Sequence, residues 1–135
     1  MRAESYFILY VADQQRSTAF YTSVLARAPR LFVPGMSEFD LPGGGVLGLM
    51  PEHGIRKLLG AGLPDPAAAN GVPRCELYVL VAEPDRWHGR ALLAGARELS
   101  PLAPRSWGHD AAYSLDPDGH VLAFAADSDD TRAVL

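Results

Sequence analysis

Apolar and polar positions in the first part of the chain repeat with two different periods, which separates expected strands from an expected helix. Residues 6–11, YFILYV, are a short run of aromatic and β-branched side chains, which is typical of a strand. Asp13 then offers a helix N-cap, and apolar residues recur at helical spacing over 14–26, until Pro29. Further extended segments are expected at 30–34, 37–41 and, after a glycine-rich turn, 46–50.

The same order of elements recurs in the second half. Residues 76–81, ELYVLV, predict a strand, and Glu83-Pro84 predicts the capped start of a helix over 85–95. An extended piece near 97–102 and a hairpin of 110–115 and 120–126 complete this half. Val11-Ala12 matches Val81-Ala82, and Ala26-Arg27 matches Ala96-Arg97. The sequence therefore predicts an α+β chain of two tandem βαβββ modules, made by duplication.

A segment rich in Pro, Gly and Ala, residues 51–75, separates the module of 4–50 from the module of 76–126. Apolar residues near its start predict one helical turn, which could serve as a flap over a site. We expect the tail from Asp127 onward to be frayed. All 135 residues fit one domain.

Composition narrows the classes of partner. The net charge is −4 and no basic run occurs, which disfavours nucleic acid and anionic membranes and would favour a cationic ligand. Cys75 is the single cysteine, so no intramolecular disulfide and no cysteine metal cluster are expected, and a reducing cytoplasm is the simple interpretation. We find no pattern of a signal peptide and no apolar run of membrane-spanning length.

Two motifs, together with the duplicated βαβββ order, resemble the vicinal-oxygen-chelate superfamily. This superfamily includes glyoxalase I, extradiol dioxygenases, fosfomycin-resistance enzymes and bleomycin-resistance proteins. The resemblance covers about residues 4–126, and Trp107-Gly108 looks most like the bleomycin-resistance branch. The motifs are Val11-x-Asp13-x-x-x-Ser17-x-x-Phe20-Tyr21-x-x-Val24-Leu25 and Asp116-Pro117-Asp118-Gly119-His120-Val121-Leu122.

The resemblance implies that the mixed sheets of the two modules curve around a cleft, and that members often dimerise, sometimes exchanging modules. It also implies a divalent metal held by His, Gln or Glu from four strands. Carried onto this chain, those four positions are Tyr6, Gly48, Glu76 and Ala123. Only Glu76 is an ordinary ligand for such a metal, so we expect no cofactor. A metal relocated to His53, His109 or Asp110 is the alternative, although their spacing does not indicate one.

Alternation along the strands predicts which side chains line the cleft. Phe7, Leu9 and Val11 should pack under the helices. Trp107 lies at the mouth of the hairpin, where it could stack on a ligand, and His109 is the one histidine near that mouth. The expected ligand-binding residues are Tyr6, Tyr10, Met50, Glu76, Tyr78, Trp107 and His109.

Each of these residues also has a structural interpretation. Trp107 could pack in a dimer interface or against the linker. Glu76 could pair with Arg74 or Arg105, or simply be exposed at a strand start. The tyrosines could form an apolar layer closed by the linker. His88 is expected on an exposed helix face, and His120 as a structural hydrogen-bonding residue.

Three functions remain open from the sequence. The first is a metal-free protein that sequesters a hydrophobic or aromatic compound, such as a drug, in the cleft of a homodimer. The second is a glyoxalase-like lyase or isomerase, or a dioxygenase-related enzyme, with a relocated metal or with Glu76 as a base. The third is an accessory domain whose cleft is filled by its own linker.

Overall fold

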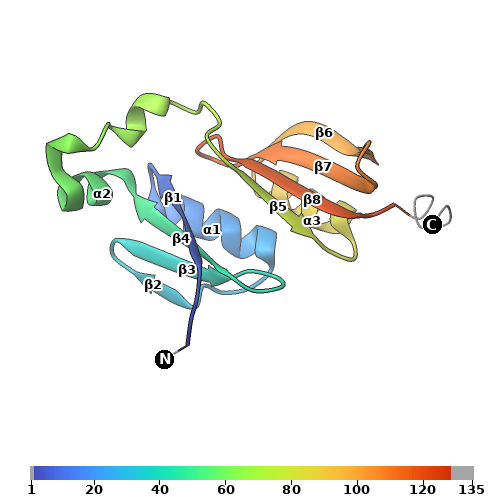
Figure 1. Cartoon of the computed structure of the whole chain (residues 1–135), viewed down its shortest axis with the longest axis horizontal. Coiled ribbons are helices and arrows are strands. Elements are labelled where there is room, and N and C mark those ends of the chain that lie inside the picture. Colours follow the sequence, from blue (N-terminus) through green and yellow to red (C-terminus); the bar gives the residue numbers. More distant parts are fainter. Residues whose placement is uncertain (1, 129–135) are drawn as a thin grey trace. The chain divides into compact units, whose positions relative to one another are not determined.

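The computed structural model describes residues 2–128, and the chain divides after Asn70 into two compact units (Figure 1). Each unit holds a four-stranded mixed sheet with a helix against it, so the predicted α+β class and duplicated βαβββ order are confirmed. The elements are β1 (Tyr6–Val11), α1 (Gln14–Leu25), β2 (Leu31–Val33), β3 (Met36–Asp40), β4 (Val46–Pro51), α2 (Glu52–Leu59), β5 (Glu76–Leu80), α3 (Pro84–Leu93), β6 (Arg97–Pro104), β7 (His109–Leu115) and β8 (Val121–Asp127).

The first unit has the strand order β1-β4-β3-β2, with β1 parallel to β4 and the other pairs antiparallel. Helix α1 buries Phe20, Tyr21, Val24 and Leu25, and the sheet buries Leu9, Val11, Leu47 and Leu49. The sequence predicts Phe7 under this helix with Leu9 and Val11, but Phe7 is 72% exposed. Along β1 the buried side chains are Leu9 and Val11, two residues apart as the alternation predicts, but burial does not extend back to Phe7.

The second unit repeats this topology with the order β5-β8-β7-β6, in which β5 runs parallel to β8. Helix α3 packs on one face, where the rings of Trp87 and Phe124 lie 5.6 Å apart. The expectation that His88 is exposed is wrong: the residue is buried, and its Nε2 lies 2.8 Å from Glu98 Oε2. The hydrogen bond to strand β6 satisfies Nε2, while the buried Nδ1 has no hydrogen-bond partner among the described residues.

The helix caps differ between the units. Asp13 caps α1 as predicted, because its Oδ1 accepts the Arg16 N–H at 2.9 Å. The Glu83 side chain makes no capping bond to α3. Glutamate is not among the preferred N-cap residues, so α3 begins on Pro84 without a side-chain cap.

Two segments are more ordered than their composition suggests. Residues 51–75 contain α2, longer than the single turn expected, and two 3₁₀ helices at Gly60–Gly62 and Pro66–Ala69. Asp127 is not frayed but ends β8, and Ser128 after it is buried; the rest of the predicted frayed tail lies outside the described residues. No helix in the described part of the chain is long and apolar enough to cross a membrane.

Candidate functional site

The second unit has one sheet face that α3 does not cover. The register of β5, β8 and β7 places side chains there in cross-strand rows, of which the central one is Tyr78, Ala123 and Tyr113. Because Phe124 contacts Trp87 of α3, the residues that alternate with it belong to the opposite side of the sheet. We call this side the open face; its members are Glu76, Tyr78, Leu80, Val121, Ala123, Ala125, His109, Ala111, Tyr113 and Leu115.

Three of the predicted ligand-binding residues meet at one end of the open face. Trp107, in the turn before β7, donates its Nε1–H to the Tyr78 hydroxyl at 2.9 Å, and that hydroxyl lies 2.7 Å from His109 Nδ1. The tyrosine and histidine rings are 5.8 Å apart and tilted by 32°. Trp107 remains 55% exposed, so an aromatic surface is held by hydrogen bonds while its ring stays accessible.

The Tyr78 hydroxyl is the centre of the hydrogen bonds in this cluster. An indole N–H can only donate, so the Tyr78 oxygen accepts from Trp107. The Tyr78 hydroxyl shares a second hydrogen bond with His109 Nδ1, and His109 Nε2 lies 3.5 Å from Asp127 Oδ1. These contacts orient the side chains of Trp107, Tyr78 and His109.

The middle of the open face is also aromatic. Ala123 is fully buried between Tyr78 and Tyr113 on the flanking strands. Desolvation, with the nearby negative charge of Glu76, raises the pKa of the Tyr113 hydroxyl, so the phenol is neutral at physiological pH. The Arg105 guanidinium lies 5.1 Å from the Tyr113 ring centroid and donates to Ala111 O at 2.7 Å.

Glu76 lies at the start of β5 and is exposed. Among the described residues no arginine forms an ion pair with it. Of the two structural interpretations, an ion pair with arginine and exposure at a strand start, the structure therefore agrees with exposure. An exposed carboxylate needs no partner, since water solvates it. It could therefore contact a charged ligand without first breaking an internal bond.

The remaining predicted ligand-binding residues lie in the first unit. Tyr10 and Met50 are cross-strand neighbours, whereas Tyr6 belongs to a network around Arg30. Arg30 donates to the Tyr6 hydroxyl at 2.7 Å and to Glu4 and Glu38, and these bonds raise the pKa of the guanidinium above its usual range. Tyr6 is thus held by a cation at the sheet surface.

The four positions that the superfamily uses for a metal do not suit one here. A side chain at Gly48 would meet Ile8 Cγ1 at 3.0 Å and Met36 Sδ at 3.4 Å, so apolar atoms already surround it. Ala123 has no donor atom in its side chain, and the Tyr6 hydroxyl faces the positive charge of Arg30. A divalent cation needs several oxygen or nitrogen ligands, and this set supplies a single carboxylate.

A second group of metal-ligand types lies in the β7–β8 turn, where ligand atoms of Asp116, Asp118 and His120 are within 4.8 Å of one another. Asp116 Oδ1 accepts the N–H groups of Asp118 and His120, both at 2.9 Å. The two ring nitrogens of His120 are bonded to Asp116 Oδ2 at 3.1 Å and to Arg74 at 2.8 Å. The group therefore stabilises the turn, as the sequence predicts for these residues.

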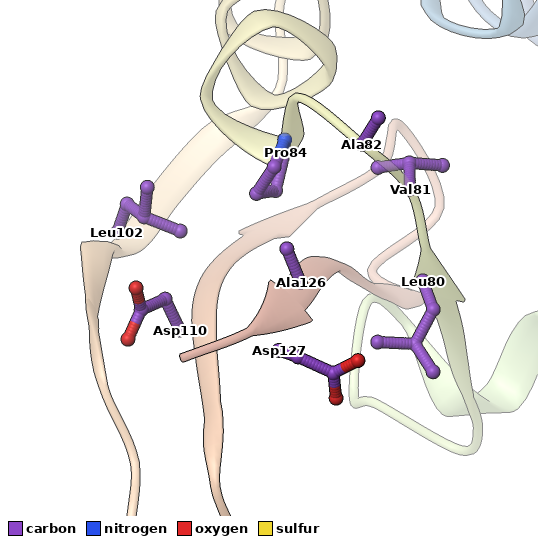
Figure 2. A pocket seen from close by; sticks show the side chains of 8 residues that line it. All are labelled: Leu80, Val81, Ala82, Pro84, Leu102, Asp110, Ala126 and Asp127. Carbon is purple, nitrogen blue, oxygen red and sulfur yellow. The ribbon is translucent and has the colours of Figure 1, made fainter. Parts of the chain in front are cut away.

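Sequence reasoning misses two acidic residues beside the aromatic cluster. It places Asp127 in a frayed tail, and it offers Asp110 only as a ligand for a relocated metal. Both line a pocket of the second unit of about 610 Å³ (Figure 2). The apolar run of 120–126 is the signal that could have found Asp127, because extending that strand by one residue places it opposite His109.

Comparisons with known proteins identify the fold. Neither a protein-family model nor a curated protein matches the chain. Among solved structures it is similar to a glyoxalase/bleomycin resistance protein/dioxygenase from Nocardioides, with 24% identity and a TM-score of 0.76 over 96% of this chain and 85% of that one.

Two further structures agree with this fold. A glyoxalase-related enzyme from Fulvimarina pelagi has 22% identity and a TM-score of 0.77, with 94% and 89% of the two chains covered. A glyoxalase/bleomycin resistance protein/dioxygenase family enzyme from Burkholderia phytofirmans PsJN has 20% identity and a TM-score of 0.75, with 93% and 100% covered. The chain therefore has the fold of the glyoxalase/bleomycin resistance protein/dioxygenase group, the vicinal-oxygen-chelate fold that its two motifs predict.

Proposed function

We propose that this chain is a metal-free binding protein that holds a hydrophobic or aromatic small molecule against the open face of its second unit. The observation that carries the proposal is the bonded cluster of Trp107, Tyr78 and His109. It presents an exposed indole ring beside a tyrosine-lined strand surface. Structures with this fold include proteins described as bleomycin resistance proteins, which is compatible with sequestration of a drug.

In this proposal the guest is bound by burial of apolar surface rather than by coordination to a metal. An aromatic guest that covers Trp107 and Tyr113 removes ring surface from water on both partners, which favours association by roughly 25 cal/mol per Å² of apolar area. The indole N–H is already satisfied by Tyr78, so covering the ring leaves no buried donor unpaired. Glu76 and Arg105 provide charges of opposite sign that can orient a polar guest.

We further propose that the binding protein is a homodimer. Three consecutive residues of β1 have large exposed side chains: Tyr6, Phe7 and Ile8. A contiguous apolar stretch of this kind on an edge strand is normally covered by another surface. A second copy of the chain is the occupant that we expect.

Fluorescence of Trp107 tests the binding proposal. In a Trp87→Phe background, where Trp107 is the only indole, we expect aromatic compounds from a panel of planar drugs to quench its emission saturably. Trp107→Ala should then weaken the affinity measured by calorimetry at least about tenfold, which corresponds to about 1.4 kcal/mol. Trp87→Phe itself is the matched control, because that ring packs against Phe124 on the helix-covered face.

Metal analysis distinguishes the proposal from the enzymatic alternative. The purified protein, incubated with Ni²⁺, Zn²⁺ or Mn²⁺ and then desalted, should retain no stoichiometric ion. Retention of one ion per chain that is lost in Glu76→Gln would contradict metal-free binding. Unchanged affinities in Trp107→Ala would contradict the role of the open face.

A further inference from the structure

The second unit has a pocket at the end of its sheet, where it shares Leu80 with the open face. It lies where the carboxyl ends of β5 and β8 meet the first turn of α3 and the start of β7, and its volume is about 610 Å³ (Figure 2). This volume suits a ligand of the size of a small drug. Its lining is formed by Leu80, Val81, Ala82, Pro84, Leu102, Asp110, Ala126 and Asp127.

The charged side chains of this lining have one sign. Six of the eight residues have hydrocarbon side chains, and the other two are Asp110 in β7 and Asp127 at the end of β8, whose carboxylates point away from each other (Figure 2). Ser128 donates to Asp110 Oδ1 at 2.6 Å and thereby orients that carboxylate. Within residues 2–128 no arginine or lysine pairs with Asp110, so no cation in that part of the chain neutralises its charge.

The helix that borders the pocket does not reverse this preference. A helix N-terminus attracts anions when free N–H groups point at them. Here α3 contributes Pro84, which has no N–H, and the N-cap residue Glu83 and the first-turn residue Asp85 add exposed carboxylates. Arg86 is the nearest arginine in sequence, and its Nη1 lies 3.3 Å from Glu83 Oε2. An anionic ligand would therefore meet like charges at this end of the helix.

We propose that this pocket binds an organic cation with an apolar body, of which a primary alkylammonium ion is the simplest. The ammonium group donates to the carboxylate of Asp110, and the alkyl chain covers Pro84 and Leu102. Charge-assisted hydrogen bonds of this kind are about twice as strong as neutral ones, so charge determines which ligand is retained. The inference goes beyond the proposed function, because it rests on a different cavity from the Trp107 ring surface.

Three probes of equal length separate charge from apolar contact. Hexylammonium, hexanol and hexanoate are titrated into the full-length protein, and backbone amide shifts are followed by NMR. We expect hexylammonium to move the amides of Val81, Ala82 and Ala126 saturably and hexanol to bind about tenfold more weakly. Hexanoate should not bind. Added salt should weaken the binding of the ammonium ion alone.

Asp110→Asn is the discriminating variant, since the amide oxygen can still accept from Ser128 and the shape is conserved. It should weaken hexylammonium about tenfold and leave hexanol unchanged. Glu76→Gln, which removes an equal charge outside the pocket, is the matched control and should change neither. Equal affinity for hexylammonium and hexanol, undiminished binding in Asp110→Asn, or shifts confined to residues outside the pocket would overturn the proposal.

The Trp107 variant keeps this test separate from the proposed function. Trp107→Ala should leave hexylammonium binding intact, and Asp110→Asn should leave quenching by neutral aromatic compounds intact. Asp127→Asn is less selective, because Asp127 also faces His109 of the aromatic cluster. If binding is not detected at one of the two sites, the assay of the other site can therefore still be interpreted.

Discussion

Gly119, in the turn between β7 and β8, is constrained by both its backbone and its neighbours. Its φ is +87°, and a Cβ there would lie 2.7 Å from the carbonyl carbon of Gly71 and 2.9 Å from its Cα. Backbone atoms cannot rotate away as a flexible side chain can. We therefore expect Gly119→Ala to lower the free energy of unfolding in urea by about 3 kcal/mol, of which about 1 is backbone strain and the rest overpacking.

Gly43 separates the two contributions. Its φ is +78°, but a Cβ added there would have no atom within 4 Å, so Gly43→Ala should cost only the backbone strain of about 1 kcal/mol. Equal losses in the two variants would show that the approach of Gly71 has no energetic consequence.

Single residues also show where sequence reasoning succeeds and where it stops. The sequence predicts that Trp107 and His109 lie close together, because both are at the start of the same hairpin. In the structure both side chains are hydrogen-bonded to the Tyr78 hydroxyl. The approach of Gly71 to Gly119 has no sequence signal, since it depends on a contact between two loops. The burial of His88 is not predicted because its partner Glu98 lies on another element.

At the scale of elements, the two equivalent helices begin differently. Asp13 Oδ1 accepts the Arg16 N–H, whereas the Glu83 side chain caps nothing and pairs only with exposed Arg86. Asp13→Ala should lower the free energy of unfolding by about 1 kcal/mol, and Glu83→Ala by less than about 0.5 kcal/mol. Urea denaturation monitored by circular dichroism measures both; a loss in Glu83→Ala as large as that in Asp13→Ala would refute the assignment.

Strands are predicted more completely than the linker, for a physical reason. Each module's first strand is a short, mainly apolar run, and the sequence places β1 correctly at 6–11. Helix α2 is expected to be one turn because its apolar residues Ile55, Leu58 and Leu59 span a single turn, whereas the helix begins at Glu52. The first three residues of α2 are not apolar, so hydrophobic periodicity underestimates the length of this helix.

At the scale of the whole molecule, the duplication seen in the sequence becomes a duplication of topology. The orders β1-β4-β3-β2 and β5-β8-β7-β6 are equivalent, with the first strand of each module parallel to its last. In both sheets that first strand is an edge strand of the sheet that the described residues form. The sequence predicts two such modules, whereas the use of an edge in the proposed homodimer depends on a second copy of the chain.

The exposed apolar stretch of β1 makes the proposed homodimer testable. We expect light scattering during size exclusion to give a mass twice the 14.5 kDa of one chain. Phe7→Lys should give the mass of one chain, because it places a charge where apolar contact with the partner is expected, and Phe7 is too exposed to affect the core. Leu93→Lys is the matched control, since Leu93 is 91% exposed and belongs to α3 of the other unit. A single-chain mass for the unaltered protein, or a dimer that persists in Phe7→Lys with unchanged circular dichroism, would contradict the assignment of this interface to β1.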